Sequence, residues 1–339
     1  EGQCHRSVAS HPLGPPLRMR SGRDASIVWS VRRAWLFVRA GSVAAGAAAH
    51  PSEGTWSPPV MTTCDPLVPD ACGPAFFIGG VMKCGTNALG EALAHHPRIA
   101  PPLISEPHFF SRIGRPEFQY FEGEPDTPEA REAYARLLPR TDGLHNITFD
   151  KSPDYFHRDL GGEFRRMFPN AKFLVILCDP SSRLWSHWYQ NMKPEAYGRD
   201  REAQMGRDFE SVLDAALTGA HMASSDDRAA AAMVAKMLHM GRYADRLQYW
   251  RAQPIDVFLV SEQELKQDPK TAVRDVLNFL NPNMTDEYPW EKLAGGVSAN
   301  VNHDKPRAPR AVMSKLEEYY AFANADLAKM TGRDWFGQP

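Results

Sequence analysis

Residues 76–90, FFIGGVMKCGTNALG, place an apolar run, a glycine turn, a lysine and a helical pattern in succession. A strand end that feeds such a turn and a helix start directs several backbone N–H groups and the positive end of the helix at one anion. Lys83 adds an ammonium group to the same turn. The segment therefore predicts a ligand that carries phosphate or a related oxyanion. A plain strand-to-helix turn with a solvated lysine is the structural alternative.

The spacing of this loop differs from that of the magnesium-dependent NTPases. Their GxxxxGK[ST] pattern needs a hydroxyl residue directly after the lysine to hold the metal. Here Lys83 is followed by Cys84, Gly85 and Thr86. The sequence therefore disfavours a metal-dependent NTPase, and we expect no metal at the site.

A carboxylate and an imidazole follow in the segment SEPHFF, where Glu106 and His108 are two residues apart. If this segment is extended, both side chains lie on the same side of the chain. The pair could then serve as a base and its helper, whereas a solvated glutamate in a proline-flanked loop is the alternative. Further on, Lys151 stands between aromatic residues in FDKSPDYF.

Strand-like apolar runs alternate with helical patterns from residue 75 onward. Continuous apolar runs of this kind suit parallel strands that are buried on both faces. The fold class is therefore predicted to be α/β, with a central, mainly parallel sheet flanked by helices. The expected strands are 75–79, 172–177 and 255–260, and the expected helices are 86–95, one that follows Cys178-Asp179-Pro180, 209–217, 226–250 and 270–280.

Polar residues that follow these strands are the candidate ligand contacts, because open parallel sheets bind ligands beyond the carboxyl ends of their strands. The first strand is followed by the lysine loop, and the second is followed by Arg183 and Ser186. A later segment, NVNHDKPRAPR, supplies Lys305, Arg307 and Arg310. A ligand with phosphate at both ends would be bound by two such separated sets of polar residues.

Composition divides the 339 residues into two parts. Residues 1–74 are rich in arginine, serine, alanine, glycine and proline, and we interpret them as a disordered targeting or linker segment. Membrane association is expected only through this segment. Residues 75–339 are expected to form the functional domain. With 39 basic and 41 acidic residues, the formal net charge is -2, which creates no overall field that favours nucleic acid.

The five cysteines show neither the spacing of a zinc site nor a dense disulfide pattern. Cys64 and Cys72 are the only pair that resembles a possible bridge. Cys84 and Cys178, which stand beside the expected ligand loops, are interpreted as small filler residues. A thiol tuned by positive surroundings is the alternative for both.

Taken in order, these segments resemble the PAPS-dependent sulfotransferases, and most of all their heparan sulfate (glycosaminoglycan) branch; PAPS is 3′-phosphoadenylyl sulfate. The resemblance extends from about residue 75 to the C-terminus and rests on the order of the motifs. The matching segments are GVMKCGTNAL, Glu106 to Phe110, Lys151 to Tyr155, KFLVILCDPSSRLWSHW, Tyr243 to Trp250, VFLVSEQEL with Asp268-Pro269, Lys305 to Arg307 and Leu316 to Trp335.

The resemblance implies a P-loop-NTPase-like three-layer fold and the transfer of a sulfuryl group from PAPS to a hydroxyl or amine, expected on a carbohydrate. Lys83 would stabilise charge on the leaving phosphate. Glu106 would act as general base, with His108 and Lys151 orienting or polarising the reacting centre. The 3′-phosphate would lie near Ser186. The residues expected to bind the donor are Lys83, Cys84, Gly85, Thr86, Asn87, Arg183, Ser186, Lys305 and Arg307.

One position departs from the family pattern, because Cys178 occupies the place of an arginine that pairs with the 3′-phosphate. A neutral thiol is a poor substitute for a bidentate guanidinium, so donor affinity should fall unless Arg183, Lys305 or Arg307 replaces it. A weakened homologue that only binds PAPS, its desulfated product PAP or a glycan therefore stays open. A P-loop small-molecule kinase is a further alternative, although neither a metal-binding hydroxyl nor a matching acid is visible.

The acceptor is expected to be an oligo- or polysaccharide, and a small metabolite or a protein tyrosine stays open. The arginines that could line a groove for an anionic chain are Arg112, Arg115, Arg158, Arg165 and Arg166. Analogy with the family places the protein in the Golgi lumen, with the cytoplasm or another organelle as the alternative. In the lumen, Asn146 and Asn283 would be N-glycosylation acceptors.

Overall fold

The chain is built on a five-stranded sheet whose neighbouring strands pair in parallel. The computed structural model describes residues 73–111, 127–140, 147–191, 207–220, 222, 224–297 and 305–337. The predicted segment 1–74 therefore lies outside the described residues, apart from its last two. The strands follow the order β2-β3-β1-β4-β5, with β1 at Phe76–Gly80, β2 at Ile99–Ala100, β3 at Ile147–Lys151, β4 at Lys172–Leu177 and β5 at Val257–Ser261.

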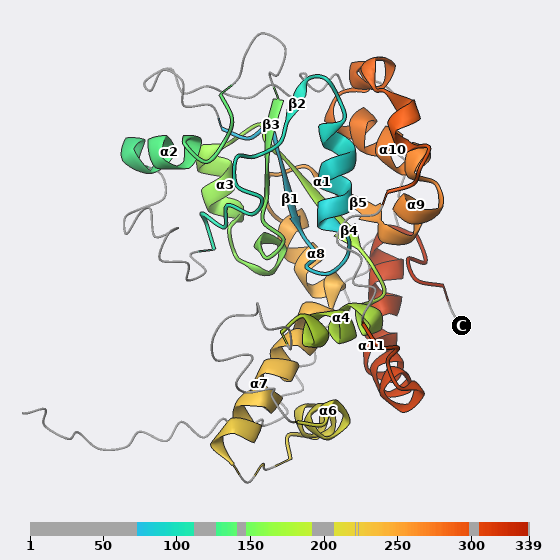
Figure 1. Cartoon of the computed structure of the whole chain (residues 1–339). Helices are drawn as coiled ribbons and strands as arrows, with labels where there is room; N and C mark the ends of the chain where they lie inside the picture. The colour runs from blue at the N-terminus through green and yellow to red at the C-terminus, as the bar shows by residue number, and fades with distance from the viewer. Residues whose placement is uncertain are drawn as a thin grey trace, which may run out of the picture. The chain divides into compact units, whose positions relative to one another are not determined.

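Helices connect the strands and flank the sheet; Figure 1 shows α1 and α10 on one side of it and α2 and α3 on the other. This arrangement is the three-layer α/β fold that was expected. The α-helices are α1 Thr86–Ala94, α2 Pro128–Ala135, α3 Gly161–Met167, α4 Pro180–Asn191, α6 Phe209–Thr218, α7 Ser225–Met240, α8 Tyr243–Arg251, α9 Glu262–Gln267, α10 Pro269–Leu280 and α11 Arg310–Thr331, and the 3₁₀ helices are η2 Tyr155–His157, η3 Pro282–Glu287 and η4 Trp290–Leu293.

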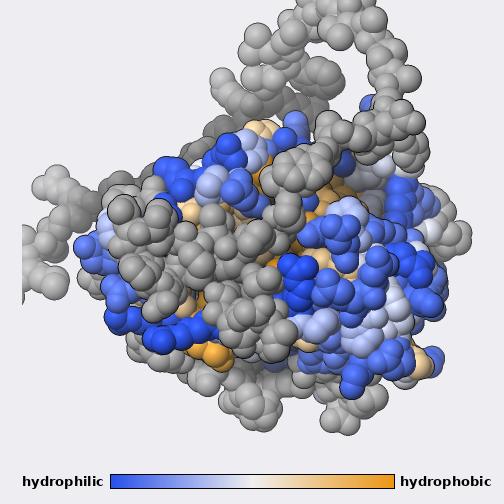
Figure 2. Space-filling model, turned by 90° about the horizontal axis from the view of Figure 1, so that it is seen from above, coloured by the Kyte–Doolittle hydropathy of each residue, from blue (hydrophilic) through white to orange (hydrophobic). Residues whose placement is uncertain are grey.

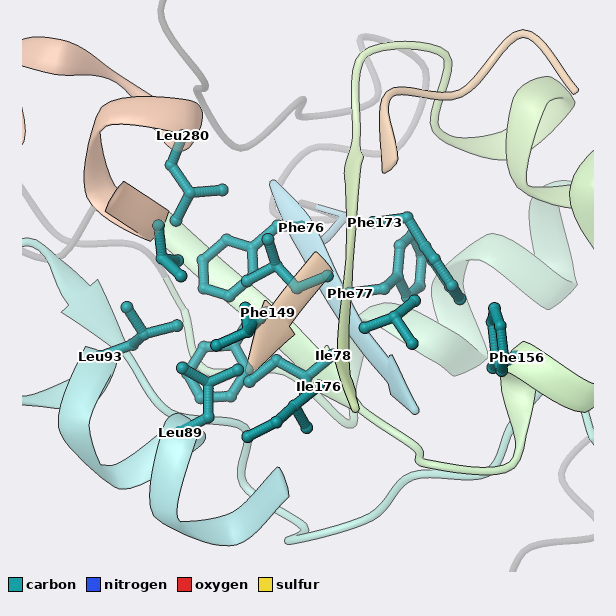
Figure 3. Packing of buried hydrophobic residues seen from close by; sticks show 14 of the residues in the cluster. Phe76, Phe77, Ile78, Leu89, Leu93, Phe149, Phe156, Phe173, Ile176 and Leu280 are labelled. Carbon is teal, nitrogen blue, oxygen red and sulfur yellow. The ribbon is translucent and has the colours of Figure 1, made fainter. Parts of the chain in front are cut away.

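Alternate residues of β1 enter the two halves of the core, because successive side chains of a strand point to opposite faces. Phe76 stacks on Phe149 of β3 with ring centroids 5.1 Å apart, on the side where Figure 3 shows Leu89 of α1. Phe77 points to the opposite side and stacks on Phe164 of α3 at 4.2 Å. The side chains of Phe76 and Phe77 are at most 1% exposed. The prediction that this strand is buried on both faces is confirmed.

A second cluster of buried apolar side chains holds α4, α6, α7 and α11 together. Leu184 and Trp188 contribute to it from α4, and the ring centroid of Phe209 in α6 lies 4.8 Å from that of Trp188. Because α4 begins just after β4, this cluster fixes the helix that carries Ser186 at the carboxyl end of the sheet.

The structure differs from the sequence prediction in its shorter elements and in one helix. The three predicted strands are confirmed within two residues, but β2 and β3 were not predicted, because β2 is short and polar residues interrupt the apolar run of β3. The helix expected at 226–250 is two helices, α7 and α8, which separate at Gly241. A Cβ atom at Gly241 would lie 2.5 Å from the hydroxyl of Tyr320, so this corner requires glycine.

One face of the described surface is mainly hydrophilic. Figure 2 shows mainly hydrophilic residues on the face seen from above, with hydrophobic residues visible in the gaps between them. Within the part of the chain that the structure describes, no helix combines the length and the apolar character needed to cross a membrane.

Gly79 of β1 offers a test of this packing, because its Cβ atom would lie 2.0 Å from Cζ of Phe173. The Phe173 ring stacks on Trp250 at 4.1 Å and has little room to move. We expect Gly79→Ala to lower the free energy of unfolding by about 1–3 kcal/mol in urea denaturation. Gly295→Ala is the control, because no atom lies within 4 Å of its Cβ position. Equal losses in the two variants would contradict the packing argument.

Candidate active site

The loop between β1 and α1 turns at the carboxyl edge of the sheet. Gly85 caps α1 with φ 89°, and Lys83 has φ 72°, a left-handed conformation that residues with a side chain rarely adopt. The N–H of Val81 donates to the carbonyl oxygen of Ile176 in β4 at 2.9 Å. Gly85, the N-cap residue, has no side chain with which to cap the first N–H groups of α1. This geometry suits an anion at the positive end of the helix, and the binding of such an anion stays a prediction.

A disulfide bond between Cys84 and Cys178 ties this loop to the end of β4. The interpretation of these cysteines as filler residues is wrong, because the parallel pairing of β1 and β4 brings them together across a sequence separation of 94. The pair considered as a possible bridge, Cys64 and Cys72, lies outside the described residues. Cys178 is consequently not a free thiol but one half of a covalent crosslink.

Glu106, His108 and Lys151 form one hydrogen-bonded cluster at the same edge of the sheet. Glu106 Oε2 lies 3.1 Å from Nε2 of His108, and its Oε1 accepts from Nζ of Lys151 at 3.0 Å. Lys151 Nζ also donates to Oδ1 of Asn87, in the first turn of α1. Nδ1 of His108 lies 2.7 Å from Oδ1 of Asp154. The expectation that Glu106 and His108 point to the same side is confirmed.

Polar groups beneath the cluster hold His108 in place. This residue has φ 51°, and its N–H donates to Oγ of Ser152 at 2.8 Å. Ser152 in turn donates to Asp150, a fully buried carboxyl that also accepts from the hydroxyls of Tyr134 and Tyr155. Burial raises the pKa of Asp150 to about 6, against the effect of these hydrogen bonds. The left-handed conformation of His108 is therefore fixed by a buried network, which the sequence pattern did not reveal.

The cluster shifts the pKa values of Glu106 and His108 in opposite directions. Burial alone would raise the pKa of Glu106, but the hydrogen bond from His108 and the charge of Lys151 lower it to about 2. Burial alone would lower the pKa of His108, but its hydrogen bonds to Asp154 and Glu106 raise it to about 9. At neutral pH, Glu106 is a carboxylate and His108 is an imidazolium that donates from both ring nitrogens.

The donor residues predicted on the loop and on α4 face each other. Thr86 and Asn87 begin α1, directly after the loop. Nζ of Lys83 donates to Oε1 of Gln190 in α4 at 3.3 Å. Ser186 lies one turn before Gln190 and hence on the same face of α4. The structure thus brings the lysine loop next to the part of α4 that carries Ser186.

Lys305 and Arg307 precede α11, and Lys305 lies near the same loop. Lys305 is half-buried, and burial lowers its pKa while the nearby charge of Glu262 raises it. Cγ of Glu262, the first residue of α9, lies 3.5 Å from the Cβ position at Gly85. The indole N–H of Trp185 donates to the carbonyl oxygen of Pro306 at 2.9 Å. Residues 305–307 therefore connect α4 with the region of the donor loop, and Arg307 is exposed.

Arg183 takes a position that the sequence did not suggest. Its side chain is 1% exposed, its Nη2 donates to the carbonyl oxygen of Met237, and its Nη1 lies 3.4 Å from Nδ1 of His187. The guanidinium therefore joins α4 to α7 inside the protein. Its predicted contact with the donor stays a prediction. The side chain of Arg183 is buried, whereas Lys83 and Arg307 are exposed.

Metal ligands were not expected, and the ammonium groups and backbone N–H groups of the site suit an anionic ligand. The carboxylates of Glu106 and Asp154, which are the oxygen ligands that a hard cation would use, are bonded to Lys151 and His108. Among the described residues, no three histidine, cysteine, aspartate or glutamate side chains lie close enough to hold a metal ion. The expectation of a metal-free site nevertheless stays a prediction.

Comparison with known proteins places this geometry in a family. Residues 74–303 match the family model described as the sulfotransferase domain. Human heparan sulfate glucosamine 3-O-sulfotransferase 6 is 30% identical over 283 residues, which cover 77% of this chain and 73% of that protein. Mouse bifunctional heparan sulfate N-deacetylase/N-sulfotransferase 4 is 28% identical over 299 residues, which cover 82% of this chain but 31% of that protein.

A solved structure supports the fold. The crystal structure of a sulfotransferase from Alicyclobacillus acidocaldarius superposes with a TM-score of 0.55 and 24% sequence identity, covering 77% of this chain and 97% of that chain. At this identity, the likeness concerns the fold. It agrees with the P-loop-NTPase-like architecture expected from the order of the motifs.

The raised pKa of His108 predicts how stability depends on pH. Its folded-state pKa of about 9 exceeds the ordinary value of 6.5, so its contribution is complete below pH 6.5 and is lost as pH rises through about 9. Between these limits, we expect the free energy of unfolding of the native chain to fall by up to about 3 kcal/mol. The free energy of unfolding of His108→Gln should not show this fall. His95→Gln, at an exposed position, serves as control in urea denaturation across pH. Parallel curves for the native chain and His108→Gln would refute the ion-pair assignment.

Proposed function

From the premise that this chain belongs to the sulfotransferase domain family and is a sulfuryl-transferring enzyme, we propose that its donor is PAPS. We further propose that its acceptor is a hydroxyl or amine of an anionic carbohydrate. The donor proposal rests on the loop after β1, and the acceptor proposal rests on the named relatives and on the charges beside Glu106.

One observation carries the proposal. Nζ of Lys151 bonds both to Glu106 and to Asn87 in the first turn of α1. A single ammonium group thus connects a carboxylate to the helix start that offers its N–H groups to an anion. Transfer between a bound donor and an acceptor requires this proximity of base and anion site.

The donor loop has the features that an adenylyl sulfate requires. Backbone N–H groups at the start of α1 would hold the 5′-phosphate, and Lys83 would neutralise the charge that accumulates on its oxygen. We propose that the 3′-phosphate binds near Ser186 and the segment at Lys305, because Lys83 bonds to α4 one turn beyond Ser186 and Trp185 of α4 bonds to that segment. These residues supply positive charge and hydrogen bonds without a metal ligand.

The chain's own groups account for the movement of one proton. During transfer, the bond between sulfur and the phosphate oxygen breaks while a bond forms between sulfur and the acceptor atom. Glu106 takes the proton of the acceptor hydroxyl or amine. Its low pKa makes it a weak base while Lys151 and His108 hold it. A shift of the Lys151 ammonium toward the negative charge on the sulfuryl oxygens would raise the basicity of Glu106 during the reaction.

The acceptor class follows from the relatives and from one arginine. Two relatives are named for heparan sulfate, one as a 3-O-sulfotransferase and one as an N-sulfotransferase. In this chain, Nε of Arg158 lies 3.4 Å from Asp154, the partner of His108, and its side chain is 41% exposed. A cation at this place would attract a sulfated or carboxylated saccharide toward Glu106. Two other arginines proposed for the groove, Arg112 and Arg115, lie outside the described residues.

A Golgi location would fit this acceptor. The two named relatives act on heparan sulfate by their names, and we propose that this chain works in the Golgi lumen. Of the two glycosylation sequences, Asn146 lies outside the described residues, whereas Asn283 is exposed in η3. An oligosaccharide could therefore be attached at Asn283 without disturbing the sheet.

Replacing the proposed base should separate chemistry from donor binding. We expect Glu106→Gln to lower kcat by about 10²- to 10⁴-fold, because the proton acceptor is lost. The affinity for PAP, measured by calorimetry, should stay close to that of the native chain. Glu91→Gln, an exposed carboxylate of α1, is the matched control and should leave both quantities unchanged. Full turnover by Glu106→Gln with any acceptor would disprove the role of general base.

Replacing the loop lysine should have the complementary effect on the donor. We expect Lys83→Ala to weaken PAP binding by about 10- to 100-fold, the range for a lost hydrogen bond to a charged group. Lys329→Ala removes an exposed lysine of α11 and controls for the change in net charge. Calorimetry at one salt concentration measures both variants. If the two variants bind PAP equally well, Lys83 does not contact the donor.

A further inference from the structure

We propose that the Cys84–Cys178 disulfide is a positioning element of the donor site and that reduction of this bond weakens donor binding. The inference rests on the proposed function, because it concerns the same donor loop. It adds that the use of PAPS depends on the oxidation state of two cysteines. Neither cysteine needs to touch the reacting atoms for this effect.

The donor loop is attached to β4 at two points. The first is the hydrogen bond from Val81 to Ile176, at 2.9 Å. The second is the covalent bond from Cys84 to Cys178, one residue beyond the end of β4. Lys83 lies between the two attachment points and adopts φ 72°. A left-handed lysine is disfavoured by itself, so the loop keeps this conformation only while both flanks are fixed.

The disulfide lies between a buried tyrosine and the backbone of Lys83. The Tyr243 hydroxyl lies 3.7 Å from Sγ of Cys84 and donates to the carbonyl oxygen of Cys178 at 3.1 Å. Sγ of Cys178 lies 3.9 Å from the carbonyl oxygen of Lys83. Cys84 has no exposed surface, and Tyr243 is 1% exposed. The sulfur atoms therefore lie against the backbone of Lys83. The geometry of this backbone determines where the Lys83 side chain and the next N–H groups point.

Loss of the covalent attachment would change the anion site more than the rest of the fold. The sheet, α1 and α4 keep their hydrogen bonds and packing, whereas the loop after Val81 loses its second anchor. The N–H groups of the loop then no longer converge on one position without an additional ordering cost. Donor affinity should fall for this reason, even in a protein that remains folded.

Cys178 is partly exposed whereas Cys84 is buried, so we expect a small dithiol to attack at Cys178. Attack of one reagent thiolate on Cys178 breaks the disulfide, and Cys84 leaves as a thiolate that takes up a proton. The second reagent thiol then displaces the Cys178 sulfur, which is also protonated, and closes the reagent's own disulfide. The protein gains two electrons and two protons, and the dithiol is oxidised.

The experiment measures PAP binding by calorimetry to the full chain, first oxidised, then reduced by dithiothreitol, then reoxidised. Peptide mapping by mass spectrometry establishes whether Cys84 and Cys178 are linked in each sample, and circular dichroism establishes whether the chain is folded. We expect reduction to raise the dissociation constant by about tenfold or more and reoxidation to restore it. The number of binding sites per chain should stay the same.

Cys84→Ser/Cys178→Ser is the matched control, because it removes the bond but keeps side chains of similar size. It should bind PAP as weakly as the reduced native chain and should not respond to dithiothreitol. A response of this variant would identify Cys4, Cys64 or Cys72 as the source of the effect and would overturn the inference. If the variant does not fold, the cycle of reduction and reoxidation of the native chain decides the matter.

Three results distinguish the possible failures. An unchanged dissociation constant after complete reduction overturns the inference and leaves the proposed function intact. A lower number of binding sites with an unchanged dissociation constant also overturns it, because the bond would then serve only overall stability. If the oxidised chain takes up no PAP, the proposed function fails and this inference fails with it.

Discussion

The parallel pairing of β1 with β3 on one side and β4 on the other is the constraint on which the site depends. Ile78 is paired with Lys151 in β3, and Gly80 is paired with Val175 in β4. Because all three strands run in the same direction, their carboxyl ends meet at one edge. The lysine loop, the ammonium of Lys151 and the sulfur of Cys178 are neighbours for this reason alone, although they are distant in the sequence.

Within this frame, the two cations beside Glu106 are held in different ways. His108 is fixed by Asp154 and by the hydrogen bond of its backbone to Ser152. Lys151 reaches both Glu106 and Asn87 through Nζ, at the end of a side chain that is 7% exposed. In the proposed mechanism, the imidazolium of His108 keeps Glu106 oriented, and the ammonium of Lys151 shifts toward the negative charge as it develops. A carboxylate with a low pKa at rest can thereby act as a base during transfer.

The sequence allowed a correct prediction of three strands, of the helices that begin near residues 86, 209, 226 and 270, and of the pairing of Glu106 with His108, because each depends on a local pattern. A short window of the sequence shows the continuous apolar runs of β1 and β4. It also shows that Glu106 and His108 are two residues apart. A local pattern could not predict three other features: the hydrogen-bond network of Asp150, the burial of Arg183 and the disulfide. Each of them joins residues that only the topology brings together. For the disulfide, one signal was present: Cys178 directly follows one strand and Cys84 lies in the loop after another, and the two strands were expected to be parallel.

The crosslink at Cys178 also changes how the anion site can obtain its affinity. A guanidinium at the end of β4 would add charge and two directed hydrogen bonds, but it would leave the loop free to move. A disulfide adds no charge, yet it fixes the backbone N–H groups of the loop before the ligand arrives, so less entropy is lost on binding. Charge must then come from Lys83 and from the segment at Lys305, both of which lie at the same edge. In the proposed donor site, the position occupied by arginine in the family pattern can therefore be a cysteine, provided that its partner is Cys84.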